Sequence, residues 1–257
     1  MSVLKATQQD NILTLTLCRP DKLNALNLEL LQSLHHELLQ ANDNPEIKAI
    51  LITGEGKAFC AGADIQRLAK CDAEQGYQFA RSGQAIFNLL ETLSKPSLAA
   101  INGYAFGGGC ELLMSATLRI ASTHAQFCQP EIKLGVIPGY GGTQRLARLI
   151  GKGRALDLCL TGRVIDAATA LSWGLVTDLV APEQLIQRAH EILHQITSMA
   201  PIAIQSILEV IHAGYDLPLN EALKMEALQF ARTCATADKT EGVSAFLEKR
   251  QAHFKGI

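Results

Sequence analysis

The chain has 257 residues, of which 48% are hydrophobic and 19% are charged. A chain of this size and composition can bury a large core, which excludes an intrinsically disordered protein. The formal net charge is −2 at pH 7, so no excess of positive charge indicates nucleic acid as the main partner. The seven cysteines form no C-x-x-C pair, which argues against a disulfide scaffold or a zinc ribbon.

Free cysteines favour a reducing compartment, and the sequence indicates no membrane segment. No apolar run reaches the roughly 18 residues that a membrane-spanning helix needs. The N-terminal residues lead directly into strand-like alternation instead of a secretory signal. We therefore expect a cytoplasmic protein without a membrane partner.

The first half of the chain predicts strands and helices in turn. Asp10-Asn11 predicts the turn of a hairpin, and Asn27 predicts the N-cap of a helix. The buried stripe of that helix is expected to hold Leu28, Leu31, Leu34, Leu38 and Leu39. We predict strands over residues 3–7, 12–17, 48–53, 97–101, 118–121 and 126–128, and further helices over 74–93 and from 107 to about 116.

From about residue 142 onward, helical patterns dominate. We predict helices over residues 143–150, 154–160, 167–173, 182–199, 201–212, 217–234 and 239–254, with one strand over 175–180. No flexible linker separates the two parts, so we expect an α/β core followed by a helical region within one cooperative unit. The division is placed between residues 1–195 and 196–257.

His190 to His194 match H-E-x-x-H, the pattern of zinc proteases. The buried stripe of this helix is expected to run through Leu185, Ala189, Ile192 and Ile196, so that both histidines face away from it. No third ligand follows at the required spacing, and we expect a solvated helix face and no metal site. The run 139–142 (G-Y-G-G) also fails the dinucleotide fingerprint, because Gln144 replaces the last glycine.

Three segments rich in small residues remain, over residues 58–65, 102–112 and 129–144. Residues without bulky side chains let a ligand approach the backbone, and two such loops can direct N–H groups at one oxyanion. Tight turns and close helix packing would explain the same glycines. The segments also carry Glu111 and Glu131 in apolar surroundings, where a carboxyl has a raised pKa and can move protons near neutral pH.

These segments together resemble the signature of the crotonase, or enoyl-CoA hydratase/isomerase, family. The resemblance covers essentially the whole chain, because it also includes residues 19–25, 160–163, 170–176 and 241–250. It implies an α/β fold with a crotonase-like β-β-α spiral core over residues 1–195. Residues 196–257 would form a helical C-terminal subdomain for trimerisation or for covering the site. The assembly implied is a homo-oligomer, either a trimer or a dimer of trimers.

The resemblance also implies an activity, that of an enoyl-CoA hydratase, which adds water to trans-2-enoyl-CoA in a reversible syn reaction and yields 3-hydroxyacyl-CoA. The backbone N–H groups of Ala63 and Gly108 would bind the thioester oxygen. Glu111 would activate the water, and Glu131 would give a proton to the α-carbon. Coenzyme A is part of the substrate, and no separate cofactor is implied.

Further residues match the positions with which the family contacts its acyl-CoA substrate: Lys22, Leu23, Ala25, Ala61, Asp64 and Ile65, with Gly139 at a helix start that orients the substrate. Phe246 and Lys249 match positions that reach the nucleotide from a neighbouring subunit. One departure is Gln66, because many hydratases have a lysine there that can contact a phosphate.

Two other functions are weighed against hydration. Isomerases of the family commonly keep one glutamate, so the pair favours a hydratase, with side isomerase activity possible. A non-catalytic RNA-binding member is opposed by the mild acidity of the chain and by the intact pair. The acyl chain length depends on residues 67–83, whose shape the sequence does not give, and the sequence does not separate fatty-acid β-oxidation from other pathways.

Overall fold

The computed structural model describes residues 2–257, which form two sheets surrounded by helices. The main sheet has six strands in the order β1-β2-β3-β5-β7-β10, and the smaller sheet has four in the order β4-β6-β8-β9. The main sheet contains β1 (Leu4–Gln9), β2 (Ile12–Leu17), β3 (Ala49–Gly54), β5 (Ser97–Ile101), β7 (Leu118–Ser122) and β10 (Asp178–Val180). The smaller sheet contains β4 (Ala58–Cys60), β6 (Tyr104–Phe106), β8 (Gln126–Cys128) and β9 (Ile165–Asp166).

From β3 to β8, consecutive strands alternate between the two sheets, so the chain winds as a spiral. Strand β3 is followed by β4, β5 by β6 and β7 by β8, and neighbouring strands from successive turns pair in parallel. Helices close the turns, namely α2 (Ile65–Leu68) with α3 (Ala73–Glu91), then α4 (Gly108–Met114), then α5 (Gly142–Ile150). This arrangement confirms the expected α/β fold with a β-β-α spiral core.

The central strands of the main sheet are apolar along their whole length because both faces are covered. Every residue of β5 is buried, as parallel strands covered on both sides require. On one face, α8 (Leu185–Thr197) packs Leu185, Ala189 and Leu193 against the sheet. On the other face lies the larger core, which includes α1 (Leu28–Asp43) and α3. The sheet is therefore a rigid base for the loops at its edge.

Two predicted helix faces need correction. Asn27 does cap α1, accepting the N–H of Leu30 at 2.9 Å, but Leu28 and Leu39 are 50% and 44% exposed. The buried face is formed by Leu30, Leu31, Leu34, Leu38 and Ala41. In α8 the buried positions are Leu185, Ala189, Leu193 and Thr197, and the expected Ile192 and Ile196 lie at its margin. In both helices, residues spaced four apart form the buried face, and other apolar residues of the same helix lie outside it.

The shortest strands and the end of the last helix also differ from prediction. Strand β4 lies within a segment interpreted as a loop, β6 and β9 were not predicted, and the strand expected over 175–180 forms only as β10. Helix α11 (Ala237–Leu247) ends before residue 254. The Asp238 carboxylate instead accepts the N–H groups of Lys255 and Gly256 at 2.7 and 2.8 Å, which holds the last residues in an extended return.

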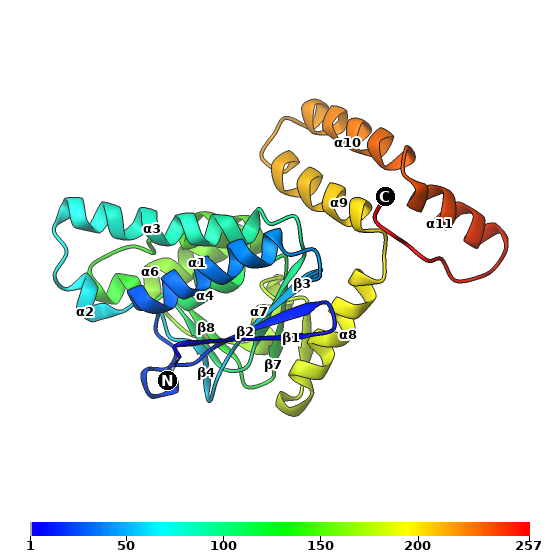
Figure 1. The fold of residues 1–257 in the computed structure, drawn as a ribbon. Coiled ribbons are helices and arrows are strands. Elements are labelled where there is room, and N and C mark those ends of the chain that lie inside the picture. Colours follow the sequence, from blue (N-terminus) through cyan, green and yellow to red (C-terminus); the bar gives the residue numbers. More distant parts are fainter. Residues whose placement is uncertain (1) are drawn as a thin grey trace.

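The C-terminal helices α9 (Pro201–Gly214), α10 (Leu219–Cys234) and α11 stand away from the core (Figure 1). The division expected after residue 195 stays a prediction, and α8 continues to Thr197. Within residues 2–257, no single helix is long and apolar enough to cross a membrane. Pro182–Thr197 and Pro201–Gly214 are long and apolar enough only when taken together, and the chain bends by 105° between them. The two remaining helices, α6 (Lys152–Thr161) and α7 (Ala167–Trp173), pack beside α5 and β9.

Candidate active site

Two backbone N–H groups meet where β4 and β6 end. These strands are parallel neighbours, so the segments that follow them emerge at the same edge of the smaller sheet. The nitrogen of Ala63 lies 3.1 Å from the point where Gly108 would carry a Cβ. Neither N–H has a hydrogen-bond acceptor among residues 2–257. Two adjacent free donors of this kind can bind one oxygen that gains negative charge.

Two glycines of this region have the structural roles that the sequence analysis considered, a tight turn and close helix packing. Gly107 has φ of +48°, a conformation that side chains disfavour, and it turns the chain from β6 into α4. Gly109 packs so closely on the carbonyl of Cys60 that no Cβ would fit. Close packing of α4 against β4 therefore fixes the place of the Gly108 N–H.

Residues 22–26 run beside residues 61–64 and join several expected substrate contacts in one surface. Ala61 donates its N–H to the Leu23 carbonyl at 2.9 Å, and Asp64 donates to the Leu26 carbonyl at 3.1 Å. Asn24 is fully buried between them, and its amide nitrogen donates to the Ala58 carbonyl at 2.8 Å. The structure thus brings together Leu23, Ala25, Ala61 and Asp64, with the exposed Lys22 and Ile65 at the margins.

Other expected contacts lie elsewhere. Phe246 is 83% exposed on α11, and Lys249 is exposed just after it, on the part of the chain that stands away from the core (Figure 1). A single chain therefore does not bring these two residues to the other expected contacts. Gly139 lies beside α3, where its carbonyl accepts a hydrogen bond from the Gln84 amide at 2.9 Å.

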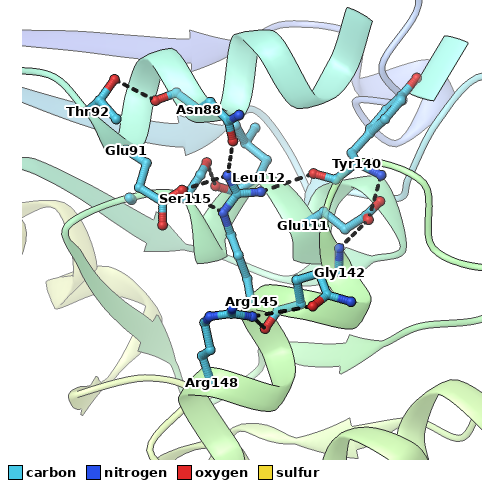
Figure 2. Close-up of polar contacts among 12 residues, drawn as sticks. Asn88, Glu91, Thr92, Glu111, Leu112, Ser115, Tyr140, Gly142, Arg145 and Arg148 are labelled. Carbon is cyan, nitrogen blue, oxygen red and sulfur yellow. Dashed lines mark hydrogen bonds and ion pairs between the residues drawn. The ribbon is translucent and has the colours of Figure 1, made fainter. Parts of the chain in front are cut away.

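Glu111 is 2% exposed on α4, and its carboxylate is held by the loop that starts α5. Its Oε1 accepts the N–H of Tyr140 at 2.8 Å and that of Gly142 at 2.7 Å (Figure 2). Burial, together with the negative charge of Glu131, raises the pKa of Glu111 to about 7, although the two N–H groups act in the opposite direction. Such a carboxyl can exchange protons near neutral pH.

Arg145 fixes the loop that holds Glu111. Its guanidinium donates to the Tyr140 carbonyl at 3.1 Å and forms an ion pair with Glu91 at 2.6 Å (Figure 2). A third contact, to the Asn88 amide oxygen at 2.6 Å, ties the same group to α3. The position of the Glu111 carboxylate therefore depends on a hydrogen-bonded network that reaches two helices.

Glu131 follows β8 and Pro130, at the start of a short 3-10 helix over Glu131–Leu134. Its Oε1 fills the space beside Gly107, and its Oε2 is buried without a hydrogen-bond partner in the described part of the chain. Burial raises the pKa of Glu131 to about 7. The site thus holds the buried carboxyl group of Glu111 and the half-buried one of Glu131. Glu111 belongs to the segment that carries the Gly108 N–H, and Glu131 lies beside it.

Gln129 and Tyr140 also lie in the site, although the sequence gave neither a role. The Gln129 side chain is fully buried, and neither its amide oxygen nor its nitrogen has a partner among residues 2–257. Its Nε2 and the Glu111 Oε1 both lie within 2.9 Å of the point where Gly142 would carry a Cβ. In the sequence, only the position of Gln129 just before Pro130 and Glu131 could have indicated that it lies in the site.

The H-E-x-x-H motif forms no cluster with the site. The His190 and His194 rings are 6.0 Å apart on α8, and His194 is exposed with Asp10 at 3.9 Å. Within residues 2–257, no group of three or more His, Cys, Asp or Glu side chains is placed to hold a metal ion.

Comparison with known proteins identifies the family. A sequence profile described as enoyl-CoA hydratase/isomerase matches residues 7–257. The chain therefore belongs to the enoyl-CoA hydratase/isomerase family.

Named relatives resemble the chain over nearly its full length. It is 40% identical to the short-chain-enoyl-CoA hydratase of Clostridium acetobutylicum, over 95% of this chain and 94% of that protein. It is 41% identical to the crotonyl-CoA hydratase of Syntrophomonas wolfei, over 96% and 95%. Among solved structures, the enoyl-CoA hydratase of Bacillus anthracis superposes with a TM-score of 0.95 at 38% identity, covering 99% of this chain and 100% of that one.

The raised pKa of Glu111 predicts how stability changes with pH. Its pKa is about 7 in the folded chain and 4.5 without burial, so the folded chain loses stability as pH rises from 4.5 through 7. Glu111→Gln cannot ionise and keeps an acceptor for both N–H groups. We expect this variant to be more stable than the wild type at pH 8, by about 2–3 kcal/mol at most, and close to it at pH 4.5.

Urea unfolding at both pH values and one protein concentration measures this difference. Glu46→Gln, in the exposed turn before β3, is the control and should change neither value. Equal stability of Glu111→Gln and the wild type at pH 8 would contradict the prediction.

Proposed function

We propose that this chain is an enoyl-CoA hydratase, which adds water to trans-2-enoyl-CoA in a reversible syn reaction and gives 3-hydroxyacyl-CoA. The observation that carries the proposal is the placement of Glu111 and Glu131, both with pKa near 7, beside two free backbone N–H groups. The names of the related hydratases from Clostridium acetobutylicum and Syntrophomonas wolfei support it.

The first part of the reaction polarises the thioester. Its carbonyl oxygen accepts hydrogen bonds from the Ala63 and Gly108 N–H groups, which draws electrons toward the oxygen and makes the β-carbon electrophilic. These donors are fixed before the substrate arrives, so they stabilise the enolate without rearrangement. Each such donor typically contributes about 100- to 1000-fold in rate.

The second part adds water. Glu111, as the carboxylate, accepts a proton from water while the water oxygen bonds to the β-carbon. Oε1 is occupied by two N–H groups, so Oε2 holds the water. Protonated Glu131 then gives its proton to the α-carbon as the enolate collapses, and proton exchange between the two carboxyls restores the starting state. Because both acids border the same segment, both additions occur on one face.

The substrate supplies every other group that the reaction requires. Coenzyme A is carried by the substrate, and the proton transfers and the oxyanion contacts come from the chain, so we propose no additional cofactor. We propose that the coenzyme A moiety lies along Lys22, Leu23, Ala25, Ala61, Asp64 and Ile65. Hydrogen bonds between residues 22–26 and 61–64 hold most of these residues in one surface. Gly139, near the start of α5, would orient the acyl part.

A homo-oligomer, either a trimer or a dimer of trimers, is proposed for the assembly. Helices α9, α10 and α11 stand away from the core and expose large apolar side chains, including Leu219 at 72%, Leu228 at 74% and Phe246 at 83%. Burial of this surface by a second copy is favourable. A neighbour's Phe246 and Lys249 would then reach the coenzyme A moiety.

All seven cysteines are free, which supports a reducing location such as the cytoplasm.

The hydratase activity is tested with crotonyl-CoA. We expect purified protein to remove the absorbance of the conjugated enoyl thioester, and Glu111→Gln and Glu131→Gln each to lower kcat by about 100-fold or more, because each removes a proton-transfer group. Glu46→Gln should match the wild type. No loss of absorbance with crotonyl-CoA or with longer enoyl-CoAs would overturn the proposal, and conversion of 3-enoyl-CoA alone would indicate an isomerase.

A second prediction tests the oxyanion contact through the backbone. In Gly108→Ala the new Cβ lies 3.1 Å from the Ala63 nitrogen and at least that far from other atoms, so the chain can still fold. The methyl group occupies space that the thioester oxygen needs. We expect kcat/KM for crotonyl-CoA to fall about 100-fold or more.

The matched control is Gly153→Ala in α6, where a Cβ meets no atom within 4 Å. It should keep full activity. Wild-type activity in Gly108→Ala, with the fold confirmed by circular dichroism, would refute the proposed oxyanion contact.

The oligomeric state is measured by light scattering on the purified protein. We expect a mass three or six times that of the 27.7 kDa chain. Phe246→Ser should weaken binding of crotonyl-CoA more than it changes kcat, because the residue would contact the coenzyme A moiety and not the reacting atoms. A monomer at micromolar concentration would overturn the assembly proposal.

A further inference from the structure

The Tyr140 side chain lies beside the catalytic groups and is buried, with 1% exposed. Its ring stacks on Phe79, with centroids 5.2 Å apart, and meets the edge of Phe87 at 5.5 Å. Its backbone N–H meanwhile binds the Glu111 carboxylate. Figure 2 shows the ring directed away from Arg145 while the N–H points to Glu111. One residue thus joins the catalytic carboxylate to an aromatic cluster on α3.

The ring lies between two glycines that are distant in the sequence. Its Cδ2 lies 3.4 Å from the point where Gly108 would carry a Cβ, so the ring borders the oxyanion segment. Its opposite edge lies over Gly83 of α3, so closely that any Cβ there would collide with it. The ring therefore spans the whole distance between the oxyanion donor and α3.

The far side of this aromatic cluster is polar. The Tyr140 hydroxyl is buried and has no hydrogen-bond partner among residues 2–257, and the same holds for Nη1 of Arg67. The Arg67 guanidinium lies 5.0 Å from the centre of the Phe79 ring. An acyl chain that reached these donors would be unfavourable there, because its methylene groups cannot accept a hydrogen bond from them.

We propose that the Tyr140 side chain forms the end wall of the acyl site and restricts the enzyme to short enoyl chains. The inference rests on the proposed hydratase function. Because the carbonyl oxygen is held at Gly108, a ring in contact with the Gly108 position is within reach of the first acyl carbons. A long chain has to displace the ring, which Gly83, Phe79 and Phe87 hold in place.

The experiment compares Tyr140→Phe, Tyr140→Leu and Tyr140→Ala with the wild type. It measures kcat/KM for crotonyl-, trans-2-hexenoyl-, trans-2-octenoyl- and trans-2-decenoyl-CoA. Each methylene group of the substrate that enters apolar surroundings raises kcat/KM by about a factor of four. We expect the ratio of decenoyl- to crotonyl-CoA to rise about tenfold or more in Tyr140→Ala, to rise less in Tyr140→Leu, and to stay within about threefold in Tyr140→Phe, which keeps the ring.

Leu34→Ala, which opens a cavity under α1 away from the site, is the control for a loosened core and should leave the ratio unchanged. If Tyr140→Ala does not fold, Tyr140→Leu still decides the outcome. An unchanged ratio in the folded variants, or a wild type that prefers decenoyl-CoA, overturns the inference while the hydratase function stands. A wild type inactive on all four substrates overturns both.

Discussion

The parallel pairing of the three strands β4, β6 and β8 is the constraint on which the site depends. Parallel neighbours end at the same edge of a sheet, and here each strand is followed within a few residues by one functional group. Ala63 follows β4, Gly108 follows β6, and Glu131 follows β8. The spiral repeats one simple turn, and each repeat delivers a different group to the same place.

The same constraint explains which features of the fold could be predicted from the sequence. Local signals were sufficient for Asn27 as a cap and for β5 as a buried strand, because hydrogen bonding of one side chain and an unbroken apolar run decide them. The segments around Ala63 and Gly108 were recognisable by their small residues, and the structure brings them together. Strands β4, β6 and β9 were not, because two or three residues carry no periodicity and pair only through tertiary contacts. The early end of α11 likewise depends on a tertiary contact, because Asp238 accepts the N–H of Lys255 near the C-terminus.

The catalytic carboxyls place a cost on folding that the surrounding structure offsets. Burying Glu111 disfavours its ionised form, and the neighbouring Glu131 charge adds to the effect. Two N–H groups from the start of α5 compensate in part, and Arg145 holds that loop at its Tyr140 carbonyl without touching Glu111. A closer cation would lower the pKa of Glu111 and leave a weaker base. The network therefore fixes the position of the carboxylate while keeping its proton affinity near neutrality.

In the proposed hydratase, Tyr140 connects this network to the substrate. Its backbone N–H binds Glu111, so the proposed catalytic role of Glu111 also fixes the place of the Tyr140 side chain. The ring can be accommodated only because Gly83 has no Cβ, and this position is far from Tyr140 in the sequence. No local pattern marks this dependence, whereas a longer side chain at Gly83 would exclude the ring entirely. In the mechanism that we propose, one short loop therefore couples chain-length preference to proton transfer.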